Sequence, residues 1–318
     1  MDNRTDTLIR ASELYYLQKL SQNAIAQMLD TSRPTVSRML EEARELGIVE
    51  IIVHSPVKKD HELSCLVREA LGLKETIVIS GDYSYEESLE RCGKAVAHFL
   101  YGILDNNLNI GISWGIATEF LAKALEFKEY HNINVLQMVG CLGTGNPRID
   151  GLELALTISK KLNGFYTNIY APLYVESEIA ASYLLKEPQI EAALRRAMHT
   201  DIVLTGIGSL DEKSSLQISG YLSESDWRTL RTQGAVGHLL GRMIDKNGKE
   251  VPFEKGKNII GAPLEALRNA KWSIGMSASE FKAEATVAAV RAGYINMLVI
   301  DQALAQKIMS MAEKGRLL

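Results

Sequence analysis

Residues 21–46 read SQNAIAQMLDTSRPTVSRMLEEAREL, and they predict two helices joined by a tight turn. Ser21 is a suitable N-cap for a first helix from about Gln22, because its hydroxyl can accept a hydrogen bond from a free backbone N–H. Four apolar residues of this helix are expected to face a core: Ile25, Ala26, Met28 and Leu29. The link that follows is short, residues 30–32. The two helices must therefore pack against each other.

The second helix has one apolar side and one polar side. Ser32 or Arg33 can cap it, and Pro34 fits its first turn, where a missing backbone N–H costs nothing. The residues expected to face inward are Val36, Met39, Leu40 and Ala43. The candidate DNA contacts on the other side are Ser32, Arg33, Thr35, Ser37 and Arg38. Arg can pair bidentately with guanine, and Ser or Thr can reach bases or phosphates, so this side is typical of a recognition helix.

A strand is expected directly after these helices. Gly47 can end the second helix, and the β-branched run GIVEIIV over residues 47–53 predicts a strand. An earlier helix over residues 6–19 would support the pair. This order predicts a winged helix-turn-helix DNA-binding domain over residues 1–54. The alternative is an ordinary helical hairpin with a solvated polar edge; the strand and the small Ala26 at the helix crossing argue against it.

The charge of this region gives the DNA-binding prediction less support. Residues 1–53 contain six basic and eight acidic side chains, a net charge of −2. Any positive field must therefore come from the placement of Arg33, Arg38 and Lys19 on one face. One such domain should bind DNA weakly, so an oligomer is expected to supply the affinity.

Composition limits the class of protein. The 318 residues, 46% of them hydrophobic, suffice for two domains. The N-terminal MDNRTDTLIR lacks the apolar core of a signal peptide, and no apolar run approaches the ~20 residues that cross a bilayer. The three cysteines and six histidines are scattered in patterns that fit neither a disulfide framework nor a metal site. We therefore expect a cytoplasmic protein without metal, cofactor or membrane partner.

The rest of the chain reads as a hinge and a larger domain. A Pro-containing segment, residues 55–62, is the expected hinge, and residues 63–318 form the second domain. A helix over residues 62–71 could link the domains or form a dimerisation surface. The strands expected beyond it are residues 75–80, 109–113, 133–139, 165–171, 202–207, 272–276 and 297–300, and the helices between them include residues 85–104, 150–162 and 282–292. This alternation predicts an α/β fold with a parallel sheet covered on both faces.

Three loops follow expected strands at the edge where such sheets bind ligands: residues 111–118 (GISWGIAT), 139–145 (VGCLGTG) and 206–209 (GIGS). The first leads into a helix, whose N-terminus favours an anion, and Ser113 and Thr118 add hydroxyls. It lacks the Lys of a nucleotide-binding P-loop. Each loop could be a simple packing turn, but three of them in one domain predict a shared pocket.

Two charged residues are further candidates. Asp245 follows an apolar stretch and precedes a turn, so it is either a turn residue or a ligand contact. Lys282 opens a predicted helix, where a positive charge opposes the helix dipole. A phosphate would explain that Lys, and the alternative is a solvated surface side chain.

The chain resembles the SorC/DeoR-type bacterial transcriptional regulators with a sugar-binding effector domain. The stretches that carry the resemblance are SRPTVSRMLEEARELGIVEI, IGISWGIAT, VLQMVGCLG, NIYAPLYVES, TDIVLTGIGS, GAVGHLLGRMIDKNG, NIIGAPLEALR and KAEATVAAVRAGYINMLVID. The resemblance implies a winged helix-turn-helix and a Rossmann-like effector domain similar to sugar-phosphate isomerases and deaminases. It also implies a repressor, a homotetramer, operator DNA as a partner and a phosphorylated sugar or polyol as the effector.

The same resemblance implies the residues of the effector site. The SWG-x-x-T loop, with Ser113, Trp114, Gly115 and Thr118, would hold the phosphate or the sugar. The pocket lining would include Gly140, Gly143, Gly206 and Gly208. Asp245 would hold sugar hydroxyls, and Lys282 would meet the phosphate or another ligand oxygen.

The sequence differs from the common family pattern at two places in the predicted pocket, and an enzyme is the alternative function. The sequence has GCLG at residues 140–143 and GMSASEFK at residues 275–282, which ends on Lys282, where paired glycines are common in the family. The alternative function is a sugar-phosphate isomerase or deaminase, which would need a general base beside the reacting carbons. Asp245 is the one pocket candidate for that base, and it has no clear partner acid. We therefore expect a regulator and not an enzyme.

Overall fold

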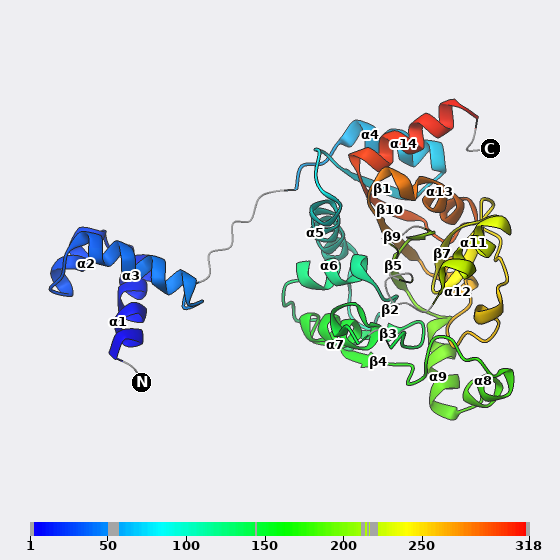
Figure 1. Cartoon of the computed structure of the whole chain (residues 1–318), viewed down its shortest axis with the longest axis horizontal. Coiled ribbons are helices and arrows are strands. Elements are labelled where there is room, and N and C mark those ends of the chain that lie inside the picture. Colours follow the sequence, from blue (N-terminus) through cyan, green and yellow to red (C-terminus); the bar gives the residue numbers. More distant parts are fainter. Residues whose placement is uncertain are drawn as a thin grey trace. The chain divides into compact units, whose positions relative to one another are not determined.

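The computed structural model describes residues 3–49, 57–143, 145–210, 214, 216 and 222–315 (Figure 1). The chain divides into two compact units, Met1–Pro56 and Val57–Leu318. Each unit has hydrophobic clusters of its own. Within the described ranges, no helix combines the length and the apolar character that a membrane span requires.

The first unit is helical. Its elements are α1 (Asn3–Ser12), a π-helical turn η1 (Glu13–Leu17), α2 (Gln22–Met28) and α3 (Arg33–Glu45). The Ser21 hydroxyl accepts the Ala24 N–H at 3.2 Å, and the Ser32 hydroxyl accepts the Thr35 N–H at 3.3 Å. Pro34 lies in the first turn of α3. The predicted start of each helix is therefore confirmed, with Ser32 as the second cap.

The packing of α2 and α3 confirms most of the predicted core. The buried hydrophobic residues among those described in this unit are Leu8, Ala11, Leu14, Ile25, Ala26, Val36, Met39, Leu40 and Ala43. The prediction for Met28 is wrong, because 59% of this residue is exposed. Ile25, Ala26 and Leu29 lie on one stripe of α2, and Met28 is displaced from the middle of that stripe by roughly 100° of helix rotation.

The predicted wing strand cannot be followed in full. Gly47, at a φ of +70°, lies in the turn after α3, and the next two residues, 48 and 49, form a bend. The remaining part of the predicted strand, residues 50–53, lies outside the described residues.

The second unit contains a seven-stranded parallel sheet in the order β1-β10-β9-β5-β2-β3-β4. Its strands are β1 (Glu75–Ile79), β2 (Asn109–Ile112), β3 (Asn134–Gln137), β4 (Phe165–Thr167), β5 (Ile202–Gly206), β9 (Trp272–Ser277) and β10 (Met297–Asp301). Each of the seven predicted strands is therefore present, although β3 and β4 are shorter than expected. The parallel sheet of the prediction is confirmed.

Helices cover both faces of this sheet (Figure 1). On one face lie α5 (Tyr85–Ile103), α6 (Ile116–Ala124) and α7 (Gly151–Lys161). The other face is covered by helices that include α4 (His61–Leu71), α13 (Ala283–Arg291) and α14 (Gln302–Glu313). Alternate residues of β10 serve the two faces: Met297 and Val299 pack with α5, whereas Leu298 and Ile300 pack on the opposite side.

The sequence analysis missed several shorter elements. They are the helices α8 (Glu178–Leu184), α9 (Pro188–Ala197), α11 (Glu224–Thr232) and α12 (Glu265–Asn269), and an antiparallel sheet of β6 (Gly208–Ser209), β7 (Ala235–Leu239) and β8 (Arg242–Asp245). Leu240 and Gly241 form the two-residue turn between β7 and β8, with φ values of +49° and +76°. Positive φ at both positions is the geometry of a hairpin turn that usually carries Asn-Gly, so Leu-Gly gave no hairpin signal.

The first residues of the second unit are fixed to its sheet. Lys59 forms a β-bridge with Ile79, and the Asp60 N–H donates to the Val78 carbonyl at 2.9 Å. The Asp60 carboxylate also caps α4 by accepting the Leu63 N–H at 2.9 Å. Residues 57–62 of the predicted hinge therefore belong to the second unit.

Replacing Ile25 by Ala should destabilise the first unit by about 2–5 kcal/mol, because Ile25 is fully buried and its loss leaves a cavity. Native-state hydrogen exchange of the full chain should show faster exchange over residues 3–49 and unchanged protection in the sheet. Met28→Ala is the matched control, because its exposed side chain should change stability by less than about 0.5 kcal/mol. Equal effects of the two substitutions would contradict the described packing.

Candidate functional site

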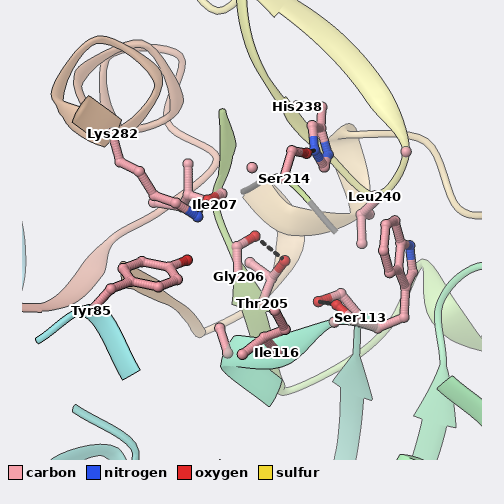
Figure 2. Close-up of a pocket in the computed structure, with 15 residues that line it drawn as sticks. Tyr85, Ser113, Ile116, Thr205, Gly206, Ile207, Ser214, His238, Leu240 and Lys282 are labelled. Carbon is pink, nitrogen blue, oxygen red and sulfur yellow. Dashed lines mark hydrogen bonds between the residues drawn. The ribbon is translucent and has the colours of Figure 1, made fainter. Parts of the chain in front are cut away.

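A cleft lies at the carboxyl ends of β2 and β5, where the first and third predicted loops meet (Figure 2). The residues that line it are Tyr85, Ser113, Trp114, Gly115, Ile116, Ala117, Thr205, Gly206, Ile207, Gly208, Ser214, His238, Leu240, Gly241 and Lys282. It encloses about 50 Å³, which is small beside the roughly 300–1,000 Å³ of most ligand pockets. A small anionic group fits this space, and the cleft is partly open to solvent, so the rest of a larger ligand can extend outward.

The first loop brings the N-terminus of α6 to the cleft. Gly115 is the N-cap residue at a φ of +110°, and no side chain caps the helix. The Gly115 N–H donates to the Ile149 carbonyl at 3.0 Å, which fixes the loop. Thr118 does not line the cleft; it is buried, with its hydroxyl 3.4 Å from that of Ser113. The uncapped N-terminal turn of α6 offers backbone N–H groups and a positive helix dipole to an anion.

The third loop contributes both of its predicted glycines. A Cβ atom on Gly206 would lie 3.1 Å from the Ala117 side chain, and one on Gly208 would lie 2.0 Å from Nε2 of His238. Side chains at these positions would therefore close the cleft or displace the imidazole. Thr205 adds a hydroxyl, which donates to the Gly206 carbonyl at 3.0 Å.

Lys282 reaches the same cleft from a distant part of the chain. It lies at the end of the 3-10 turn η4 (Glu280–Lys282), directly before α13, and 8% of it is exposed. Its ammonium group donates to the Ile207 carbonyl at 2.9 Å and lies 5.7 Å from the centre of the Tyr85 ring. Lys282 is therefore not a solvated surface side chain. Lys282 is the only charged side chain among the described residues that line the cleft. The one other basic residue in this lining is His238, whose imidazole is neutral.

His238 is a lining residue that the sequence analysis missed. It lies on β7, is 6% exposed, and has Nε2 3.1 Å from the Ser214 hydroxyl oxygen. Burial, together with the nearby Lys282 ammonium, lowers the pKa of His238 from 6.5 to about 3, so the imidazole is neutral at physiological pH. The sequence around His238 gave no indication of a role in the cleft, because it is one histidine inside an apolar stretch. The antiparallel pairing of β6 and β7 is what places it beside Gly208.

Besides Thr118, three predicted effector contacts lie outside the cleft. Gly140 packs against the chain around residue 171, where a Cβ atom would lie 2.6 Å from the Ala171 carbonyl oxygen. Gly143 is exposed at a φ of +68°. The Asp245 carboxylate accepts the N–H groups of Asn247 and Lys249 at 2.8 and 2.9 Å, which is the turn role of the alternative reading. Local geometry thus accounts for these residues without a ligand.

The predicted DNA contacts gather at the N-terminal end of α3. Arg33, Ser37 and Arg38 are exposed, whereas the hydroxyls of Ser32 and Thr35 lie 2.8 Å apart in the helix cap. Arg33 and Arg38 form no ion pair with another described residue. Across the described part of the chain, no group of three His, Cys, Asp or Glu side chains could hold a metal ion.

The neutral imidazole of His238 should make stability depend on pH. Between pH 6.5 and about 3 the unfolded chain binds a proton at this residue that the folded chain does not. The free energy of unfolding should therefore fall as the pH is lowered below 6.5, by up to about 1.4 kcal/mol per pH unit from this one group. In denaturant titrations at pH 7, 6 and 5, His238→Phe should show a shallower decline than the original chain. Identical declines would refute this assignment.

Comparisons with known proteins agree with the fold. Residues 55–310 match the family described as "Putative sugar-binding domain". The deoxyribonucleoside regulator of Bacillus subtilis is 30% identical, over 98% of this chain and 99% of its own length. The sorbitol operon regulator of Klebsiella pneumoniae is 28% identical, over 97% of this chain and 100% of its own length.

Solved structures show the same likeness. The full-length sorbitol operon regulator SorC from Klebsiella pneumoniae superposes with a TM-score of 0.74 at 25% identity, over 97% of this chain and 99% of that one. A DeoR family transcriptional regulator from Listeria monocytogenes has a TM-score of 0.73 at 28% identity, over 78% of this chain and 98% of that one. The chain therefore belongs to the SorC/DeoR-type family of sugar-binding transcriptional regulators.

Proposed function

We propose that the cleft binds a phosphorylated sugar or polyol, and that this effector controls how several DNA-binding units of a homo-oligomer, a tetramer by family resemblance, fit an operator. The protein itself is a sugar-responsive transcriptional regulator. Its site of action would be the bacterial cytoplasm, and its expected action is repression of a carbohydrate operon.

The charge of the cleft carries this proposal. Lys282 supplies a buried positive charge, the N-terminus of α6 adds a positive dipole, and no described lining residue is acidic. The Lys282 ammonium donates to the Ile207 carbonyl, and an anionic ligand would add a charge-assisted hydrogen bond to the same buried group. A phosphate also accepts several hydrogen bonds, which the backbone N–H groups of the α6 turn can donate.

The remaining walls suit a carbohydrate. Trp114, Tyr85 and Leu240 offer aromatic and aliphatic surface, while Ser113 and Thr205 offer hydroxyls. Sugars carry C–H surfaces as well as hydroxyl groups, so this mixture supports a sugar or polyol attached to the anionic group.

The first unit supports DNA binding through α3. Arg33 and Arg38 lie exposed at the helix end that reads base edges in related helix-turn-helix geometries. The net charge of −2 over residues 1–53 means that one unit has little general attraction for DNA. Two units at half-sites about 34 Å apart, or a multiple of that, would gain affinity together, and an effector that alters their separation would alter binding.

The enzyme alternative has less support from the same cleft. An isomerase or deaminase needs a base that accepts a proton near neutral pH, and no described lining residue is a carboxylate. His238 is a weak base there, because burial and Lys282 lower its pKa to about 3. The lining favours binding over turnover.

Lys282→Met should weaken binding of phosphorylated ligands by roughly tenfold to a hundredfold, the range for one charge-assisted hydrogen bond. Calorimetry with inorganic phosphate and with pentose and hexose phosphates measures the loss. Operator binding without effector should be unchanged. Lys271→Met, at an exposed position outside the cleft, is the control. Unchanged phosphate affinity in the Lys282 variant would exclude the proposed anion site.

Arg38→Ala should weaken operator binding by roughly 1–3 kcal/mol if this side chain reads a base. Footprinting and competition with random DNA separate the two possible roles, because a backbone contact would weaken both kinds of DNA equally. Arg44→Ala is a matched control at the opposite end of α3, where Nε of Arg44 donates to the Leu40 carbonyl at 3.4 Å.

A further inference from the structure

His238 is an enclosed polar side chain in the wall of the cleft, and the anion site at Lys282 does not use it (Figure 2). It comes from β7, in the small antiparallel sheet, whereas Lys282 comes from the segment between β9 and α13. The two residues therefore reach the cleft from separate structural elements.

The cleft is built around the imidazole. β6 places Gly208 opposite His238, and a Cβ atom at position 208 would lie 2.0 Å from Nε2. The indole of Trp114 lies nearly parallel to the imidazole, at 12°, with ring centres 6.3 Å apart. The backbone at Gly208 and the indole thus both restrict where the ring can lie. Such restriction is typical of a recognition group that must keep one orientation.

The chemistry of the imidazole is that of a neutral hydrogen-bonding group. A neutral imidazole has one N–H donor and one acceptor nitrogen. Ser214 stands 3.1 Å from Nε2 and adds a hydroxyl that can donate or accept. A group with both donor and acceptor capacity, and no charge, is the complement of a ligand hydroxyl.

The two walls of the cleft therefore differ in charge. In Figure 2, Lys282 and Tyr85 form one side, while His238 and Ser214 lie together on another. The imidazole itself offers a neutral donor and acceptor to a ligand group beside it, whereas Lys282 offers a full positive charge. The cleft suits a ligand with one anionic end and a neutral, hydroxylated remainder.

We propose that His238, together with Ser214, hydrogen-bonds a hydroxyl group of the effector and thereby selects a hydroxylated ligand over its deoxy analogue. This inference rests on the proposed function, in which the anionic end of the effector lies at Lys282. A site that hydrogen-bonds a ligand hydroxyl rejects the analogue without it, because the buried polar groups of the site then have no partner.

Calorimetry on the full chain can test this with inorganic phosphate and with pentose and hexose phosphates from which one hydroxyl is removed at a time. The original chain should bind at least one parent compound roughly tenfold more tightly than one of its deoxy forms, the ratio for a single neutral hydrogen bond. His238→Phe should bind the parent compound and its deoxy form with similar affinity, and it should keep its affinity for inorganic phosphate. His238→Gln, which retains an amide donor and acceptor, should preserve much of the difference.

Thermal melts establish that each variant is folded, and Ser214→Ala provides a second test in which the imidazole remains. In the Ser214→Ala variant, the affinities for the parent and deoxy compounds should differ less than in the original chain. If no phosphorylated compound binds the original chain, the anion site fails. If sugar phosphates bind but the Phe and Ala variants keep the original ranking, the role of His238 is refuted while the anion site stands. Loss of inorganic phosphate binding in His238→Phe would also refute it, because the ring would then act through the general structure of the cleft.

Discussion

All seven strands of the large sheet run parallel, and the cleft depends on this one constraint. Parallel strands place all their carboxyl ends at one edge, so the loops after β2 and β5 become neighbours although about 90 residues separate them along the chain. Their glycines leave room between them, and the segment after β9 brings Lys282 to the same edge. The ammonium group then joins these parts through its hydrogen bond to the Ile207 carbonyl.

Much of this architecture could be predicted from the sequence, because the deciding signals are local. Ser21 and Ser32 act as helix caps through contacts three residues away, so their role follows from short-range pattern. The apolar strands alternate with helices at a spacing that permits few topologies. Lys282 was identifiable because a cation in the first turn of a helix needs a compensating partner.

The residues that could not be predicted depend on contacts between distant segments. His238 lines the cleft because β6 and β7 pair antiparallel, and the turn between β7 and β8 uses a leucine at positive φ. Gly140 was expected in the pocket, but its lack of a side chain serves close packing against residue 171. Asp245 was also expected in the pocket, but its carboxylate accepts backbone N–H groups from residues within four positions. These local hydrogen bonds account for the aspartate at this position of the motif.

The hydrogen bond between Lys282 and the Ile207 carbonyl has a consequence for the sensitivity of the regulator to its ligand. A ligand that uses the Lys282 ammonium must compete with the Ile207 carbonyl for it. The apparent affinity for such a ligand would be the intrinsic affinity multiplied by the fraction of molecules in which this hydrogen bond is broken. A substitution that weakens the hydrogen bond between Lys282 and the Ile207 carbonyl would lower the ligand concentration at which the regulator responds, although the substituted residue makes no contact with the ligand. The threshold of the genetic switch can thus evolve separately from its specificity.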